Sequence, residues 1–161
     1  MKACIQYDSK TGNTKQLADV IRKTFSQNLV DTPEQADVIF LGSWTDKGSC
    51  SQAIQAVAEN LQNKKVFLFG TCGFGGSEAY YDQIFRRTAA LLPASNQIIG
   101  HFYCQGKMPV SVKERYLKML QEDPGNSRLQ QSLENFEHAR THPDQQDLRQ
   151  LQDILNALVL P

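Results

Sequence analysis

Three hydroxyl side chains lie close together near the start of the chain, in Ser9–Thr14, which has the sequence SKTGNT. The apolar-rich run Ala3–Tyr7 precedes this stretch and apolar residues at helical spacing follow it, so the order predicts a strand, a polar loop and a helix. Because the first turn of a helix has unpaired N–H groups and a partial positive charge, such a loop is suited to bind phosphate. The alternative is an ordinary strand-to-helix turn in which Asn13 or Thr14 caps the helix.

A second polar loop, Ser43–Ser49, is expected after the buried strand Asp37–Gly42. It contains the one tryptophan of the chain, Trp44, and a large aromatic side chain in such a place is suited to stack on a flat heterocycle. The alternative is a tryptophan that covers the end of the core. Gly48 supplies a backbone that can adopt a positive φ, although it could also simply close a tight turn.

A third loop, Thr71–Ser77, is rich in glycine and follows the apolar run Lys65–Gly70. A backbone without side chains can approach the edge of a ring and offer N–H groups to it, and Phe74 could lie against the ring face. Cys72 also lies here, but no histidine is near it in sequence. Since a nucleophilic cysteine needs a base or a lowered pKa, a catalytic role is not expected.

Strands are expected to alternate with helices along the whole chain. The strand runs are apolar throughout, which is typical of strands buried on both faces of a parallel sheet that helices cover. Ligands in such sheets bind outside the carboxyl ends of the strands. The expected strands are 3–7, 37–42, 65–70 and 97–104, with a short second strand near 29–30, and the expected helices are 13–27, 51–61, 78–92, 112–120, 129–139 and 144–158.

The composition is that of one globular domain. The chain has 161 residues, with 17 basic and 17 acidic side chains, so its zero net charge gives no reason to expect nucleic acid or an anionic membrane as partner. No apolar run approaches the roughly 20 residues that span a bilayer, and no signal-peptide pattern is present. The four cysteines lack zinc-ligand spacing, so free thiols in a reducing compartment, the cytoplasm, are expected; they are Cys4, Cys50, Cys72 and Cys104.

The first loop matches neither the Walker A motif nor the dinucleotide-binding glycine pattern. It resembles the phosphate loop of the flavodoxin family, Ser/Thr-x-Thr-Gly-x-Thr after the first strand, and each specified position is filled: Ser9, Thr11, Gly12 and Thr14. The runs GSWTDKG, KVFLFGTCG, FYCQGKM and HARTHPDQQDL are similar to a bacterial branch of that family. The resemblance covers most of the chain.

The resemblance implies a flavodoxin-like α/β fold, a three-layer sandwich whose five-stranded parallel sheet has the order 2-1-3-4-5. It implies a single domain over 1–161, with 124–161 as a helical C-terminal extension packed on it, and FMN as the cofactor. Gly48 resembles the residue that lets a peptide turn over and bond the flavin N5 when the ring takes up an electron. The implied FMN-binding residues are Ser9, Lys10, Thr11, Gly12, Asn13 and Thr14; Ser43, Trp44, Thr45, Asp46, Lys47 and Gly48; and Thr71, Cys72, Gly73, Phe74 and Gly75.

The family resemblance implies an electron carrier that meets redox partner proteins, donor and acceptor reductases, and is a monomer or a weak dimer. We expect no catalytic residues and no metal. Two alternatives stay open: an FMN-dependent NAD(P)H:acceptor oxidoreductase, and an accessory subunit of a larger reductase that binds a partner without flavin. The zero net charge departs from the acidic character of typical flavodoxins. Because less negative charge would surround the reduced flavin, we expect its second one-electron potential to be less depressed than in an acidic flavodoxin.

Overall fold

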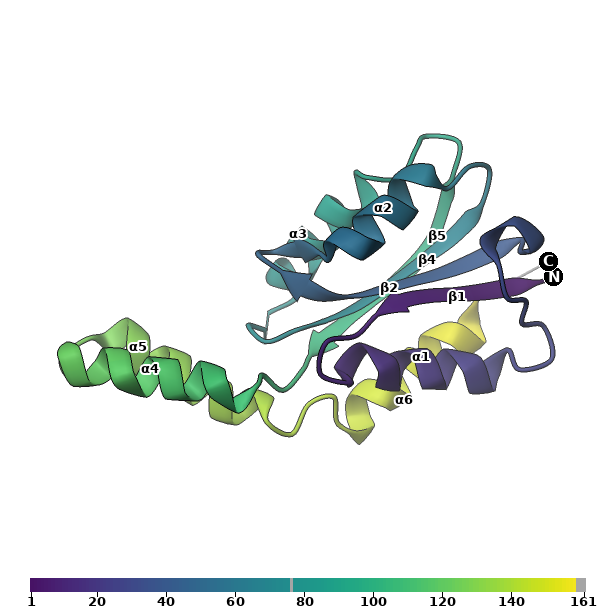
Figure 1. Ribbon diagram of the computed structural model, residues 1–161. Helices are drawn as coiled ribbons and strands as arrows, with labels where there is room; N and C mark the ends of the chain where they lie inside the picture. Colours follow the sequence, from purple (N-terminus) through teal and green to yellow (C-terminus); the bar gives the residue numbers. More distant parts are fainter. Residues whose placement is uncertain (76, 159–161) are drawn as a thin grey trace.

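The computed structural model describes residues 1–75 and 77–158, so Gly76 of the third loop and residues 159–161 of the expected extension lie outside it. The chain forms a three-layer α/β sandwich in which a parallel sheet lies between helices (Figure 1). The strands are ordered β1-β2-β4-β5 in space, with the short β3 (Ser49–Cys50) beside β2. The four main strands are β1 (Ala3–Asp8), β2 (Val38–Asp46), β4 (Lys65–Cys72) and β5 (Gln97–Gln105).

The expected strand order, 2-1-3-4-5, is confirmed. The strand numbered 2 in that order is reduced to one bridge. Leu29 pairs in parallel with Ala3 on the outer side of β1, where the sequence predicts a short strand. Across the sheet, the order is this bridge, then β1, β2, β4 and β5. These four strands are parallel to one another. The chain therefore has the sheet topology that places a ligand at the carboxyl ends of its first strands.

The sheet is buried on both faces because alternate residues of each strand pack against different helices. In β2, Val38 and Phe40 face α1 (Asn13–Thr24) and α6 (Gln145–Ala157), whereas Ile39 faces α2 (Gln52–Asn60) and α3 (Glu78–Ala89). Successive side chains of a strand point to opposite faces. Two apolar layers consequently require a continuous apolar run, which is the pattern that predicted the strand.

Polar side chains fix where the helices begin. Ser77 caps α3 by accepting a hydrogen bond from the Tyr80 N–H, as predicted, and Ser51 caps α2 in the same way. At α6, Asp144 and Asp147 form a reciprocal capping box. Within the described residues, no helix is both long enough and apolar enough to cross a membrane.

The predicted loop Ser43–Ser49 is wrong, because β2 continues to Asp46 and turns back into β3 as a hairpin. Lys47 and Gly48 form the two-residue turn, and both have a positive φ, 50° and 78°. That backbone twist matches the twist of paired strands. The apolar run ends at Leu41, but backbone pairing with β4 persists as far as Trp44, so side-chain polarity did not mark the end of the strand.

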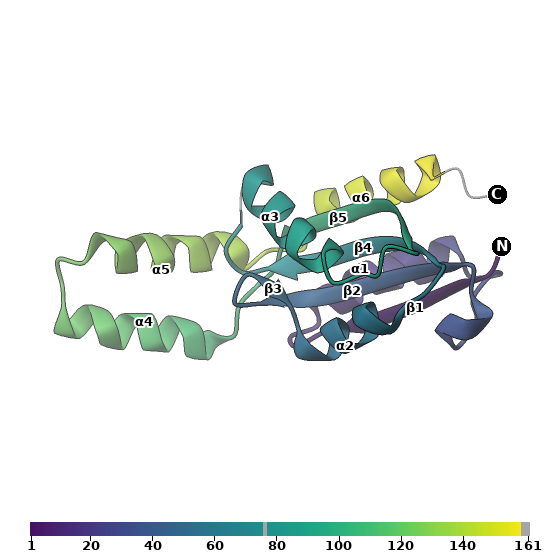
Figure 2. The same cartoon turned by 90° about the horizontal axis from the view of Figure 1, so that it is seen from above.

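The helices α4 (Val110–Glu122) and α5 (Ser127–Ala139) lie side by side and project beyond the carboxyl end of the sheet (Figures 1 and 2). Each of the two helices has a buried aromatic side chain, Tyr116 in α4 and Phe136 in α5. The structure thus divides the residues of the expected extension between two places. Helix α5 belongs to this helical hairpin, whereas α6 packs beside α1 on the sheet.

Candidate functional site

A cleft of about 350 Å³ opens at the carboxyl ends of β1, β2 and β4. The four main strands of the sheet are parallel, so the loops that follow them meet at this edge. Each of the three predicted ligand loops supplies part of the lining. The predicted site residues that line the cleft are Lys10, Thr11, Asn13, Trp44, Thr45, Thr71, Cys72 and Gly73.

The first loop joins β1 to α1 through a glycine in the left-handed region. Gly12 has φ +88° and stands at the N-cap of α1, where no side-chain cap is present. Ser9 accepts a hydrogen bond from the Lys15 N–H at 3.2 Å. Neither Asn13 nor Thr14 is the cap, so the capping alternative for these two residues does not apply. The loop leads into the positive end of a 12-residue helix.

Asn13 carries an unused hydrogen-bond acceptor. Its side chain is 6% exposed, and its Nδ2 donates to the Lys107 carbonyl at 2.8 Å. A flipped amide would place two oxygens face to face, so this bond fixes the orientation of the group. Among the residues that the structure describes, Asn13 Oδ1 is the one buried side-chain polar atom without a partner. Asn13 lines the cleft, but its unpaired Oδ1 is enclosed in the wall and is not exposed to the cleft.

Two predicted hydroxyl groups, those of Thr14 and Ser43, are buried and do not line the cleft. The Thr14 and Thr71 hydroxyl oxygens lie 3.0 Å apart, and both side chains are buried. Thr45 donates to the Thr71 carbonyl at 2.9 Å. Ser43 is buried too, and its hydroxyl accepts from the Ser51 N–H at 2.8 Å. Thr14 and Ser43 therefore tie elements together below the cleft.

Trp44 lines the cleft in a fixed orientation. Its ring is half-buried, and its Nε1 donates to Asp8 Oδ2 at 3.0 Å. The Lys10 ammonium lies 4.8 Å from the ring centroid, within reach of a cation–π interaction. The sequence did not single out Asp8, which ends β1 beside Ser43 in the register of the sheet.

Other predicted residues do not line the cleft. Asp46, Lys47 and Gly48 form the tip of the β2–β3 hairpin, where the Gly48 carbonyl accepts from Arg87 at 3.0 Å. The Phe74 side chain is 47% exposed.

Gly75 is closely surrounded, because a Cβ there would lie 2.8 Å from the Tyr81 hydroxyl and 3.3 Å from Gln105. A side chain at this position would require the Tyr81 hydroxyl, the far end of its side chain, to shift.

Cys72 is buried at the inner wall of the cleft. Burial raises the pKa of its thiol from 9.0 to about 12, and its sulfur donates weakly to the Cys104 carbonyl. A thiol in this state does not supply a thiolate near neutral pH. The geometry agrees with the sequence interpretation that Cys72 is not a nucleophile.

One wall of the cleft was missed by the sequence reasoning. It comes from the end of β5 and the first turns of α4, where two cations, Lys107 and Arg115, join Lys10 in the lining. The only sequence signal was the run FYCQGKM, which contains no recognisable ligand motif. The wall consists of Gly106, Lys107, Met108, Pro109, Ser111, Val112 and Arg115.

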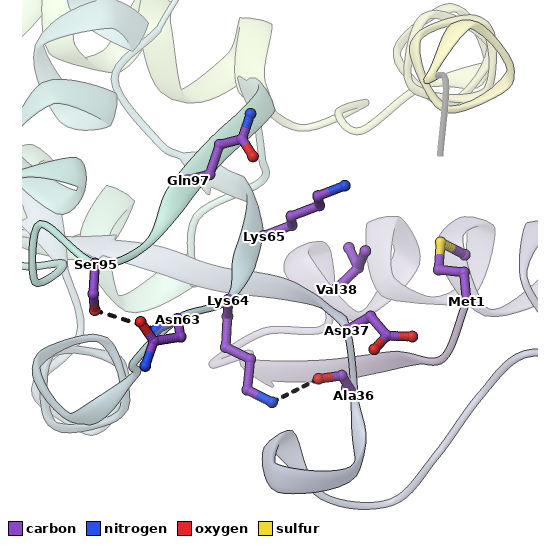
Figure 3. Close-up of a pocket in the computed structure, with 9 residues that line it drawn as sticks. All are labelled: Met1, Ala36, Asp37, Val38, Asn63, Lys64, Lys65, Ser95 and Gln97. Atoms are coloured by element: carbon purple, nitrogen blue, oxygen red, sulfur yellow. Dashed lines mark hydrogen bonds between the residues drawn. The ribbon is translucent and has the colours of Figure 1, made fainter. Parts of the chain in front are cut away.

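A larger depression, of about 580 Å³, lies at the opposite, amino end of the sheet (Figure 3). Some of the polar groups around it bond to one another. Lys64 Nζ donates to the Ala36 carbonyl at 2.6 Å, and the Asn63 N–H donates to the Ser95 hydroxyl at 3.2 Å. The smaller cleft is the better candidate, because residues of all three predicted ligand loops line it.

Comparison with known proteins places this chain in a family. A family model described as "Flavodoxin domain" matches residues 4–156. A flavodoxin-like domain-containing protein BilS from Clostridioides difficile (strain CD3) is 38% identical over 159 residues, which cover 92% of this chain and 90% of that protein. A BilS protein from Clostridium symbiosum (strain WAL-14163) is 34% identical over 179 residues, covering 96% and 94%. The structure of oxidised flavodoxin 2 from Bacillus cereus has a TM-score of 0.52 at 18% identity and covers 98% of this chain and 97% of its own, a likeness of fold.

Proposed function

The chain belongs to the flavodoxin family, and from this premise we propose that it binds FMN and carries electrons between redox partner proteins. Bound FMN would supply one-electron and two-electron redox chemistry. The protein would bind it, orient it and set its electrostatic surroundings. The family and the arrangement of three loops around one cleft support this proposal.

The meeting of the three predicted loops around one cleft is the observation that carries the proposal, and the unpaired Asn13 Oδ1 adds a buried acceptor beside it. A phosphate group accepts hydrogen bonds and cannot satisfy an acceptor oxygen, whereas a hydroxyl group can. FMN combines the two, because a chain of hydroxyls joins its phosphate to its ring. Ser9, Thr11 and the N–H groups at the start of α1 would hold the phosphate, and Asn13 would accept from a hydroxyl after a local shift that exposes its enclosed Oδ1. The residues present fit this cofactor.

Trp44 would lie against the flavin, since it is an aromatic side chain of the lining whose orientation Asp8 already fixes. Lys10, Lys107 and Arg115 would place positive charge near the cofactor. Positive charge stabilises an anionic reduced state. This agrees with the expectation, from the zero net charge, of a less depressed second potential.

Electron transfer is favoured by the chemistry of the cleft. Its described lining contains cations, amides and hydroxyls, and no carboxylate or imidazole to move a proton for a substrate. The cationic wall is the observation that favours the second candidate, an FMN-dependent NAD(P)H:acceptor oxidoreductase, since Lys107 and Arg115 could attract an anionic nicotinamide cofactor.

We further propose a reducing compartment, the cytoplasm, as the place of action. All four cysteines are free and buried, and buried thiols in electron-transfer proteins remain reduced where the surroundings are reducing. Protein partners of unspecified identity, donor and acceptor reductases, belong to the same proposal.

The visible spectrum of the purified protein tests the proposal, followed by anaerobic addition of NADH and then NADPH. We expect bound FMN that neither nucleotide bleaches within minutes and that a chemical reductant reduces. Rapid bleaching by NADPH would replace the carrier with the oxidoreductase. A protein that neither contains FMN nor takes it up would leave the accessory subunit.

A further inference from the structure

The third ligand loop is held by a partly buried network of side chains from the end of β5 and from α5, in which Gln105 is buried and His138 is exposed. The Gly73 carbonyl accepts two hydrogen bonds, from Gln105 Nε2 and Asn135 Nδ2, each at 3.0 Å. Gln105 Nε2 also donates to Asn135 Oδ1 at 3.0 Å, and Gln105 Oε1 lies 2.9 Å from His138 Nδ1. Gln105 is 3% exposed. Every polar atom of its amide therefore has a partner, as a buried amide requires.

The geometry also fixes the directions of these bonds. Because Gln105 Nε2 must donate to the Gly73 carbonyl, its Oε1 faces His138, so His138 Nδ1 carries the hydrogen. His138 in turn stacks on His142, with ring centroids 5.4 Å apart. Asn135 of α5 thus reaches a loop that precedes it by 62 residues in sequence.

The same region of the molecule also holds the first ligand loop. The Lys107 carbonyl accepts from Asn13, and the Lys107 N–H donates to the His142 carbonyl at 2.9 Å. These bonds join the start and the end of the helical hairpin to each other and to the phosphate loop. On the third loop, Met108 packs against Gly73, where a Cβ would lie 2.5 Å from the Met108 Cγ.

We propose that the base of the α4–α5 hairpin is part of the cofactor site, with Gln105, Asn135 and His138 as positioning residues for the third loop. This inference rests on the proposed FMN function. In a trans peptide the N–H points opposite to the carbonyl. Holding the Gly73 carbonyl therefore fixes the direction of the Phe74 N–H, a donor of the loop expected to meet the flavin.

The test uses full-length apoprotein, with FMN as the titrant and hydrogen exchange of the amides of Gly73, Phe74 and Gly75 as a second readout. Asn135→Ala removes one of the two donors to the Gly73 carbonyl. We expect a dissociation constant for FMN raised by roughly tenfold and faster exchange in the loop. Gln131→Ala, at an exposed position one turn away on α5, should leave both readouts at their wild-type values.

A pair of variants at His138 separates positioning from simple support of the fold. His138→Ala removes the donor to Gln105 Oε1 and should raise the FMN dissociation constant by about threefold. His138→Asn keeps an amide donor near the Nδ1 position and should restore the affinity. If Asn135→Ala lowers the urea midpoint of the apoprotein, this pair of variants still distinguishes positioning of the loop from support of the fold.

The outcomes separate this inference from the proposed function. Wild-type protein that does not bind FMN would refute the function, while faster loop exchange in Asn135→Ala would still support positioning. Unchanged affinity and unchanged exchange in both alanine variants would overturn the positioning role. Equal loss in His138→Ala and His138→Asn would overturn the role of the His138 donor.

Discussion

The two ends of the same sheet differ in how their polar groups are satisfied. At the amino end, the Lys64 ammonium bonds to the Ala36 carbonyl, and the Lys2 N–H bonds to Asp37. At the carboxyl end, Asn13 keeps a buried oxygen that nothing in the described chain reaches. The amino-end depression is the larger of the two, so size is a poorer guide to a site than unpaired chemistry.

The direction of the chain explains this difference. Helices that follow parallel strands begin at the carboxyl end of the sheet, so α1 and α3 present N–H groups there and their carbonyl ends to the other edge. Lysines such as Lys64 suit the edge that collects carbonyls. The edge that collects N–H groups is suited to an anion.

Among substitutions that compare the two ends of the sheet, Asn13→Leu is expected to have the largest effect on FMN affinity. The substitution keeps the shape of the side chain but removes both the bond to Lys107 and the free acceptor. We expect FMN affinity to fall by about a hundredfold, the cost of two lost hydrogen-bond partners in a buried site. The check is titration of the apoprotein. Lys64→Met, the matched change at the amino end, should lower stability by about 1 kcal/mol and leave FMN affinity unchanged.

A smaller loss is expected from Trp44. Trp44→Leu removes the aromatic surface and should weaken FMN binding by about tenfold. Trp44→Phe keeps a ring but loses the bond to Asp8, so its loss should be about threefold. Equal affinity in Trp44→Leu and the wild type would show that the ring does not contact the flavin.

Alkaline pH should lower the stability of the fold through a buried thiol at the carboxyl end of the sheet. The Cys72 thiol has its pKa raised from 9.0 to about 12 by burial, so the folded state keeps a proton that the unfolded state loses. Stability is therefore full below pH 9 and falls between pH 9 and 12, by about 1 kcal/mol at pH 10. Urea unfolding at several pH values measures this slope.

Substitution of the cysteines measures how much of that slope belongs to Cys72. Cys72→Ala should reduce the slope without abolishing it, because burial also raises the pKa of Cys104 well above 9.0. Cys4→Ala should change it less, because the Gln6 amide that bonds the Cys4 sulfur lowers its pKa and partly offsets the effect of burial. An unchanged slope in Cys72→Ala would contradict the assignment.

The smallest effect is expected from Lys10→Ala. Its ammonium lies over Trp44 at the rim of the cleft and is exposed. FMN affinity should fall by about threefold at low salt and less at high salt, because exposed charges are screened. Lys65→Ala at the amino end should leave the affinity unchanged at any salt concentration. An unchanged affinity in Lys10→Ala at low salt would mean that the lysine points to solvent when FMN is bound.

Much of the fold could be predicted because burial on two faces leaves a direct trace in sequence. The run Asp37–Gly42 is apolar since Phe40 and Ile39 face different helices. The extension of β2 to Asp46 left no such trace, because backbone pairing and a Lys47–Gly48 turn maintain it. A strand held by its backbone cannot be recognised from apolar spacing.

The site could be predicted where a loop carries a local motif, as Ser9–Thr14 does. The wall that includes Lys107 and Arg115 could not, because these residues line the cleft only through the placement of α4. The unpaired oxygen of Asn13 was likewise beyond sequence reasoning. It depends on the Lys107 carbonyl, a backbone group 94 residues away.

Titration of full-length apoprotein with FMN, followed by the emission of its single tryptophan, tests the central claim most directly. If the carboxyl-end cleft binds FMN, emission from Trp44 should be quenched to saturation at one FMN per chain, and Asn13→Leu should shift the curve to higher FMN concentration by about a hundredfold. Quenching that does not saturate, or a curve that Asn13→Leu leaves in place, would contradict the assignment of this cleft.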